Sequence, residues 1–391
     1  MLHEKRVRQH LRTFGRMLEA YTGTEPLARF LTGFYRQNKQ MGSADRRMAS
    51  RLLYHYFRIG HAASAAPVME RLAMAEYCCS SESAVVALLQ PGWVQHITAS
   101  LEEKIAFLEA HTAFRRSDIF PYRPQLSEGV DAEAFTNSLL EQPDLFIRLR
   151  APFARQVKAA LDAAQIPYTV SADHTLALPN GTALDRVSGI AGKYEVQDLS
   201  SQRTGAYFRA AAGQQWWDAC AGAGGKSLLL LDTTPGVELL VSDVRGSILR
   251  NLDERFDAAG ITARYGRKII DLTRDPHAVL GNAAFDGIIL DAPCSGSGTW
   301  SRTPEQITAF QQDAINTFSA LQRQLAGHAI AHLKPGKPFI YITCSVFAAE
   351  NEATVSFLQQ HYGLELEEQT MLTGYHQHAD SLFVARLIKK Q

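Results

Sequence analysis

Residues 214–227 read QQWWDACAGAGGKS, a strand-like run that ends in a glycine-rich turn and leads into a helical stretch. Four further runs in the C-terminal half have strand character and are separated by helical stretches: ELLVSD, TARYG, DGIILDAPC and KPFIYITCS. Strands that alternate with helices predict an α/β fold with a doubly wound, mostly parallel sheet, whose ligands bind at the carboxyl ends of the strands. Functional residues are therefore expected directly after these strands.

The glycine-rich turn indicates a site for an anionic or nucleoside ligand. Its glycines allow a close approach of the backbone, and the N–H groups that begin the next helix favour an anion. A phosphate-binding loop is the main alternative, because the GKS run at 225–227 matches the end of that motif, but Cys220 stands where its first glycine belongs. The complete glycine pattern of dinucleotide-binding folds is also absent.

Two acidic residues follow the next two predicted strands. Asp243 ends the run ELLVSD, 18 residues after Gly225. An acid about 20 residues past a glycine-rich loop can accept hydrogen bonds from the ribose hydroxyls of a nucleoside. The alternative role for Asp243 is an N-cap on the following helix. Asp271 follows the third predicted strand and is expected to line the adenine end of the same site.

Two cysteines follow the last two predicted strands. Cys294 comes three residues after Asp291, and Cys344 follows the run KPFIYIT. Neighbouring parallel strands lie about 4.8 Å apart, so both thiols can face one crevice. Carbon 5 of cytosine is a poor nucleophile until a thiolate adds at carbon 6, so a thiol here favours chemistry on a pyrimidine carbon rather than on an exocyclic amine. The residue types alone do not decide which cysteine would add.

The first part of the chain is predicted to be all-helical. Apolar residues recur there at steps of three and four, as in Leu11, Phe14 and Leu18, which is the spacing of one helix face. Residues 1–60 carry 12 Lys and Arg against 4 Asp and Glu, a net charge of +8, whereas the rest of the chain carries −8. A basic terminus suggests a surface that faces nucleic acid, and a solvated helical surface is the alternative.

The composition excludes several classes of protein. The 391 residues include 40 basic and 40 acidic side chains, and 46% are hydrophobic, which is typical of a globular protein of two or three domains. No apolar run is long enough to span a membrane, and the charged start lacks the apolar region of a signal peptide, so a cytoplasmic protein is expected. The adjacent Cys78 and Cys79 lack the spacing of a zinc site, and no metal is expected.

Three motifs resemble those of one enzyme family. DACAGAGGK at 218–226, DAPCSGSGTW at 291–300 and TCSVFAAENE at 343–352 are similar to the cofactor-loop, Asp-Ala-Pro-Cys and Thr-Cys-Ser motifs of the RNA cytosine-5 methyltransferases of the Fmu/Sun/Nop2 family. The similarity covers about residues 140–391. The helical N-terminus, with GSADRRMASRLLYHYFR at 42–58, resembles the NusB-like RNA-binding domain that is fused to the bacterial 16S rRNA member of this family.

The resemblance implies a role for each candidate residue. Cys344 would be the nucleophile, Cys294 would assist release of the product, and Asp291 would bind the N3/N4 edge of the flipped cytosine. The implied cofactor is S-adenosylmethionine, held by Ala219, Cys220, Ala221, Gly222, Ala223, Gly224, Gly225, Lys226, Asp243, Asp271 and Asp291. Gly222-Ala223 stands where the family usually has Ala-Pro, which should loosen the loop but keep its N–H donors.

The expected fold is a doubly wound, Rossmann-like methyltransferase sheet, preceded by a small α+β subdomain and an all-α NusB-like domain. The expected boundaries are 1–120 for the NusB-like domain, 126–205 for the subdomain and 206–391 for the methyltransferase domain. The expected function is methyl transfer to carbon 5 of a cytosine in RNA, with 16S rRNA as the expected partner, through a covalent adduct at carbon 6. Methylation of tRNA and a catalytically idle RNA-binding role in ribosome assembly are the alternatives.

Overall fold

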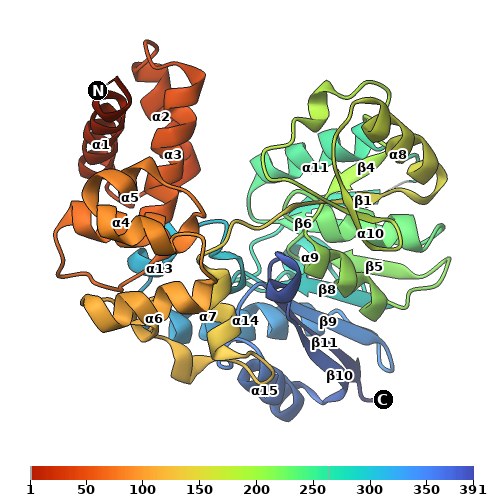
Figure 1. Ribbon diagram of the computed structural model, residues 1–391. Coiled ribbons are helices and arrows are strands. Elements are labelled where there is room, and N and C mark those ends of the chain that lie inside the picture. The colour runs from red at the N-terminus through yellow and green to blue at the C-terminus, as the bar shows by residue number, and fades with distance from the viewer. Residues whose placement is uncertain (1, 264) are drawn as a thin grey trace. The chain divides into compact units, whose positions relative to one another are not determined.

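The computed structural model describes residues 2–263 and 265–391, so Met1 and Arg264, the latter within the run TARYG, lie outside the described residues. The chain forms two compact units (Figure 1). Unit 1 comprises the residues up to Pro124 together with Asp131–Gln142 and Thr299–Gln312. Unit 2 comprises Gln125–Val130, Pro143–Gly298 and Asp313–Gln391.

Unit 1 is helical, as predicted. Its α-helices are α1 (Leu2–Ala20), α2 (Leu27–Gln37), α3 (Ser43–Arg58), α4 (Val68–Cys79), α5 (Ala84–Leu89), α6 (Leu101–His111), α7 (Ala132–Ser138) and α13 (Glu305–Ala309). The apolar stripe of α1, which includes Leu11, Phe14 and Met17, is buried in one core with Leu52 and Leu53 of α3. The three- and four-residue spacing of these side chains places them on the buried face of each helix.

One part of unit 1 comes from the C-terminal half of the chain. Within Thr299–Gln312, Trp300 is 1% exposed, and its ring centroid lies 5.0 Å from that of Phe310 and 5.9 Å from that of Phe120. The carboxyl group of Glu305 accepts the N–H of Leu27 at 3.1 Å and so caps the start of α2. The chain that follows Cys294 therefore enters the core of the helical unit. The expected division into three consecutive segments does not include this discontinuous part.

Unit 2 begins with a four-stranded antiparallel sheet in the order β2-β3-β1-β4. Its elements are β1 (Leu145–Leu149), α8 (Ala154–Ala163), β2 (Thr169–Ala172), β3 (Thr175–Leu178) and β4 (Tyr194–Val196). Val157 and Leu161 of α8 share a buried core with Ile147 and Leu149 of β1. This is a small α+β fold of the expected kind, and α9 (Leu199–Arg203) leads from it to the main sheet.

The main sheet has seven strands in the order β10-β11-β9-β8-β5-β6-β7. The strands are β5 (Gln215–Asp218), β6 (Glu238–Asp243), β7 (Tyr265–Ile269), β8 (Gly287–Asp291), β9 (Pro338–Thr343), β10 (Leu364–Leu372) and β11 (Leu382–Lys389). Strands β5 to β9 pair in parallel, and β11 joins β9 and β10 in antiparallel fashion. The fold is therefore the predicted Rossmann-like α/β sheet.

Helices cover both faces of this sheet (Figure 1). They are α10 (Gly225–Thr233), α11 (Gly246–Ala258), α12 (His277–Leu280), α14 (Ala314–Ile330) and α15 (Glu352–Tyr362). Successive residues of a strand point to opposite faces. Trp217 accordingly packs in one core with Leu325 of α14, whereas Trp216 packs in the other with Leu252 of α11. Burial of both faces explains why the central strands read as continuous apolar runs.

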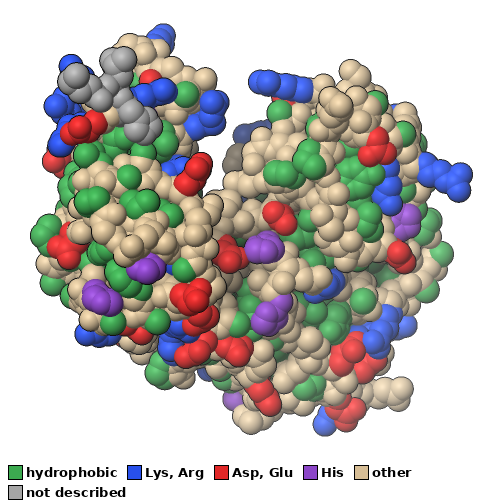
Figure 2. Space-filling view, in the orientation of Figure 1, with side chains coloured by type: hydrophobic (Ala, Val, Ile, Leu, Met, Phe, Trp, Pro, Cys, Tyr) green, Lys and Arg blue, Asp and Glu red, His purple; other side chains and the backbone are tan. Residues whose placement is uncertain are grey.

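The surface of unit 1 carries much of the basic charge of the N-terminus. On α1, exposed Lys5, Arg8, Arg12 and Arg16 recur at steps of three and four and therefore share one helix face. Figure 2 shows Lys and Arg side chains gathered around this part of the unit. Arg58, in contrast, is 1% exposed and donates hydrogen bonds within unit 1. Among the described residues, no helix has the length and apolar character that a membrane span needs.

Candidate active site

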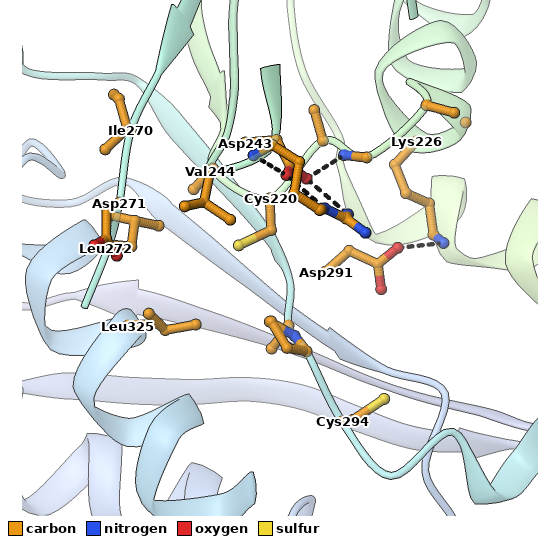
Figure 3. A pocket seen from close by; sticks show the side chains of 18 of the residues that line it. Cys220, Lys226, Asp243, Val244, Ile270, Asp271, Leu272, Asp291, Cys294 and Leu325 are labelled. Atoms are coloured by element: carbon orange, nitrogen blue, oxygen red, sulfur yellow. Dashed lines mark hydrogen bonds and ion pairs between the residues drawn. The ribbon is translucent and has the colours of Figure 1, made fainter. Parts of the chain in front are cut away.

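The carboxyl ends of β5, β6, β8 and β9 meet at one cavity of about 620 Å³ in unit 2 (Figure 3). Strand order reverses at β5, which pairs with β6 on one side and β8 on the other. A crevice at such a reversal is the usual ligand site of this fold. All the predicted site residues line the cavity except Gly224. The further lining residues are Val244, Arg245, Arg255, Ile270, Leu272, Thr273, Ala292, Pro293, Leu321 and Leu325.

The glycine-rich loop owes its path to two residues with positive φ. Gly222 has φ 52° and Gly224 has φ 81°, a region that other residues rarely adopt. A Cβ atom at Gly224 would lie 2.8 Å from the Cγ of Leu252 on α11. Gly224 therefore serves close packing behind the loop, while the other residues of the loop face the cavity.

Asp243 ends β6 inside the cavity and is 5% exposed. Its Oδ2 accepts the N–H of Gly222 at 3.1 Å, and its Oδ1 accepts the N–H of Arg245 at 2.9 Å. The guanidinium group of Arg245 also donates to both oxygens. Burial raises the pKa of Asp243, but the hydrogen bonds from Arg245 and Gly222 outweigh burial and hold the pKa below its usual value. The carboxylate is therefore ionised and placed for donors such as ribose hydroxyls.

Lys226 and Asp291 form an ion pair at the other end of the cavity. The Nζ of Lys226, in the first turn of α10, lies 2.9 Å from the Oδ2 of Asp291, the last residue of β8. The Lys226 side chain is 9% exposed and that of Asp291 is 32% exposed. Asp291 therefore keeps an accessible carboxylate edge beside the cysteines.

Asp271 also reaches the cavity, although the third strand differs from the prediction. Strand β7 covers Tyr265–Ile269 and not TARYG at 262–266. Most of its residues are exposed, so it lacks the apolar signature that locates a strand in a sequence. Asp271 lies two residues past β7, and its carboxylate accepts the N–H and hydroxyl of Thr273.

Cys294 and Cys344 lie side by side, with 3.2 Å between their Sγ atoms. Parallel pairing of β8 with β9 brings the ends of the two strands together. The hydrogen bond with Cys344, burial and the negative charges of Cys344 and Glu350 raise the pKa of Cys294 well above its usual value. Burial also raises the pKa of Cys220, the third thiol in the cavity, which makes it a poor nucleophile.

Residues 207–388 match the family described as 16S rRNA methyltransferase RsmB/F. This segment belongs to the RsmB/F methyltransferase family. It contains the glycine-rich loop, both cysteines and the main sheet except for Lys389, the last residue of β11.

Two curated relatives of the RsmB/F segment carry the name ribosomal RNA small subunit methyltransferase B. The protein from Erwinia tasmaniensis is 34% identical over 200 residues, which cover 51% of this chain and 46% of the relative. The protein from Xylella fastidiosa strain Temecula1 is 30% identical over 281 residues, which cover 67% of this chain and 64% of the relative. The chain spans about half the length of such curated relatives.

Solved structures share the fold. The protein PH0851 aligns with a TM-score of 0.69 and 20% identity, over 91% of this chain and 93% of that protein. NSun6 from Pyrococcus horikoshii, solved with SFG, aligns with a TM-score of 0.59 and 17% identity, over 68% of this chain and 96% of that protein. At these identities the comparison establishes the fold alone.

The cofactor of the RsmB/F segment is S-adenosylmethionine, and the cavity fits this molecule. Its volume of about 620 Å³ suits a ligand of this size. Asp271 and Leu272 lie at one end, Lys226 and Asp291 at the other, and Asp243 between them (Figure 3). We expect the two ends to hold the adenine and the amino-acid group, with the ribose at Asp243. No cluster of metal-ligating side chains occurs among the residues that the structure describes.

Replacement of Asp243 should weaken cofactor binding. Asp243→Ala removes an ionised acceptor, and each charge-assisted hydrogen bond lost should cost about 1.5–3 kcal/mol of binding free energy. Calorimetry with S-adenosylmethionine measures the effect. Asp257→Ala, which removes an exposed carboxylate of α11 outside the cavity, is the matched control and should leave binding unchanged. Tight binding of ATP, with no response to S-adenosylmethionine, would instead favour a phosphate-binding loop.

Asp218 is a buried acid to which sequence reasoning assigned no role. It is fully buried at the end of β5 and accepts the hydroxyl of Ser227 at 2.5 Å. Burial raises the pKa of Asp218 to about 7. The folded state therefore holds this proton up to about pH 7, whereas the unfolded chain releases it near pH 4, so stability is lost as the pH rises between these values.

This linkage predicts a pH-dependent difference between the unsubstituted protein and Asp218→Asn. The free energy of unfolding of the unsubstituted protein should fall relative to that of the variant by about 1.4 kcal/mol per pH unit between pH 5 and 7. Above that range the difference should level off. Urea unfolding of both proteins at several pH values measures it, and a constant difference would show that Asp218 is already ionised at pH 5.

Proposed function

We propose that the protein transfers a methyl group from S-adenosylmethionine to carbon 5 of a cytosine in RNA, with 16S rRNA as the substrate. The RsmB/F family and the names of the curated relatives support ribosomal RNA methylation. The 3.2 Å contact between Cys294 and Cys344 carries the proposal for carbon 5, because methylation of an exocyclic amine needs no thiol.

The two thiols would act in succession on one cytosine. The thiolate of Cys344 adds to carbon 6, which makes carbon 5 nucleophilic. S-adenosylmethionine, when bound, supplies an electrophilic methyl group to carbon 5. Cys294 then helps to remove the proton of carbon 5, and the bond between carbon 6 and Cys344 breaks to release the product. The resemblance of TCSVFAAENE and DAPCSGSGTW to the Thr-Cys-Ser and Asp-Ala-Pro-Cys motifs supports this assignment of the two roles.

Asp291 would orient the base. Its accessible carboxylate edge lies at the cysteine end of the cavity, where it can accept a hydrogen bond from N4 of cytosine. The ion pair with Lys226 keeps this carboxylate in place. Negative charge that develops on the ring when Cys344 adds would be offset by the ammonium group of Lys226.

Unit 1 would bind the RNA as a NusB-like domain. The exposed basic face of α1 supports this role. Replacement of Arg8, Arg12 and Arg16 by Gln should reduce RNA affinity and flatten its salt dependence, with a loss of about 0.7–0.9 in the slope of log K against log salt for each phosphate contact. A filter-binding salt titration measures the slope.

The matched control for this prediction replaces Arg155, Arg186 and Arg250, which are exposed on unit 2. This variant has the same change in net charge and should keep the original slope. Equal slopes for all three proteins would identify the α1 face as a solvated surface only.

The proposed function is tested by mapping 5-methylcytosine across total RNA from cells with and without the gene. Loss of a single methylated position in 16S rRNA is the expected result. Loss at a tRNA position would shift the substrate to tRNA. No change in any RNA, together with no methyl transfer by the purified protein, would favour the idle RNA-binding alternative.

A further inference from the structure

The two cysteine loops share one buried anchor. Glu350 is fully buried in the turn between β9 and α15. Its carboxyl oxygens accept hydrogen bonds from the loop after β8 and from the loop after β9. We propose that Glu350 is a positioning residue that holds the thiols of Cys294 and Cys344 in contact. Its meaning for catalysis rests on the function proposed above.

Each oxygen of Glu350 binds a different loop. Oε2 accepts the N–H of Ser295, the residue after Cys294, at 2.9 Å. Oε1 accepts the hydroxyl of Ser345, the residue after Cys344, at 2.6 Å. The Oγ atoms of the two serines lie 3.1 Å apart, so the two loops also contact each other directly. One carboxyl group therefore fixes the residues next to both thiols.

Residues of α14 and β9 hold Glu350 in place by hydrogen bonds. Gln322 of α14 donates its amide to Oε2 of Glu350 at 2.8 Å. Tyr341 of β9 donates its hydroxyl to the backbone oxygen of Glu350 at 2.6 Å, and this hydroxyl lies 3.0 Å from the Oε1 of Gln322. All three side chains are fully buried. A buried polar network of this kind specifies one arrangement, because any other leaves polar groups without partners.

Strand pairing alone does not determine the spacing of the thiols. The paired register of β8 with β9 ends at Asp291 and Ile342, before either cysteine is reached. In the proposed reaction one thiol acts at carbon 6 and the other at carbon 5, which are bonded neighbours. Their spacing must therefore be maintained by contacts beyond the strands, and Glu350 provides contacts to both loops.

The charge of Glu350 also affects the pKa of Cys294, and this effect can be separated from its positioning role. The hydrogen bond with Cys344 and burial are the larger causes of the raised pKa of Cys294, and the negative charge of Glu350 adds to them. Cys344, Glu350 and the buried hydroxyl of Tyr341 are the titratable groups that interact with Cys294. Removal of the charge without loss of the hydrogen bonds should lower the pKa of Cys294 and leave the thiols in contact.

Two substitutions separate these effects. Glu350→Gln keeps the shape: its amide oxygen can accept from Ser295 and Gln322, and its amide nitrogen can donate to the hydroxyl of Ser345. Glu350→Ala removes all three contacts. The measured quantity is the equilibrium in glutathione buffers between the dithiol and the Cys294–Cys344 disulfide, in which the two thiols lose two protons and two electrons to oxidised glutathione.

The expected results differ between the variants. The disulfide equilibrium constant should fall about tenfold or more in Glu350→Ala and stay within about threefold in Glu350→Gln, because it reports how closely the thiols are held. Alkylation of Cys294 by iodoacetamide should begin at lower pH in Glu350→Gln. Affinity for S-adenosylmethionine should be unchanged in both variants, whereas a merely structural role would lower it together with stability. Glu76→Ala, which removes a fully buried carboxyl group in unit 1, is the matched control.

Should Glu350→Ala fail to fold, Ser345→Ala removes the hydroxyl that binds both Glu350 and Ser295 and should lower the disulfide equilibrium constant in a folded protein. An unchanged constant in folded Glu350→Ala or Ser345→Ala overturns the proposal, and so does the absence of a disulfide in the unsubstituted protein. A lowered constant in a protein that shows no methyl transfer to RNA would overturn the proposed function and leave the positioning role standing.

Discussion

Cys344→Ala should abolish methyl transfer and leave the affinity for S-adenosylmethionine intact. In the proposed reaction only the thiolate of Cys344 adds to carbon 6, so the loss should reach the detection limit of a tritium-transfer assay on 16S rRNA. Calorimetry on the same protein confirms that the cofactor site persists. Cys79→Ala, a substitution in unit 1 outside the cavity, is the control and should keep full activity.

Cys294→Ala should act later in the reaction. Without Cys294 the proton of carbon 5 is removed slowly, so the bond between Cys344 and the RNA should persist. A denaturing gel should then show protein shifted by covalently bound RNA, and this band should be absent from the double variant Cys294→Ala/Cys344→Ala. A shifted band from Cys344→Ala, with none from Cys294→Ala, would exchange the two roles and make this enzyme resemble the DNA cytosine-5 methyltransferases.

Trp300→Ala should destabilise unit 1 by about 3–5 kcal/mol, the usual cost of removing a large aromatic side chain from a core. Trp300 is 1% exposed, and its ring contacts those of Phe310, Phe120 and Tyr122. Urea unfolding followed by far-ultraviolet circular dichroism measures the loss. The affinity for S-adenosylmethionine in the folded protein should stay the same, because the cavity is lined by residues of unit 2.

Trp93→Ala is the matched control for this prediction. Trp93 packs on Tyr77 and Phe107 of unit 1 but is only half-buried, so its removal should cost clearly less. Equal losses for the two variants would show that the segment after Cys294 contributes no more to the helical core than a surface aromatic residue.

The chemistry-bearing residues could be located from the sequence because each follows a strand with a strong local signal. The buried strands β5, β8 and β9 read as apolar runs. Asp291 ends β8, Cys294 comes three residues later, and Cys344 comes directly after β9. In contrast, β7 is largely exposed, so its position was predicted three residues too early. The pattern of apolar and polar residues reveals a strand only where the strand is buried, because burial requires apolar side chains.

Contacts between residues that lie far apart in the sequence could not be predicted, because no local pattern indicates them. Glu350 binds Ser295 across 55 positions. Arg245 covers the carboxylate of Asp243, for which the sequence indicated a ribose contact or a helix N-cap. The pKa of Asp218 depends on how deeply the glycine-rich loop and α10 bury the end of β5. The sequence pattern does not indicate this burial. Tertiary packing, rather than local propensity, decides these features.

The helical unit is encoded in discontinuous stretches of the gene, because Thr299–Gln312 belongs to its core. A chimera that exchanges only the first 124 residues with those of a relative would join a foreign helical core to the native Trp300 and Glu305. The two parts of this core must therefore change together during evolution, and a functional graft of the helical unit must carry both. Substitutions that accumulate in α2 should be matched by substitutions around Glu305, more than 270 positions away.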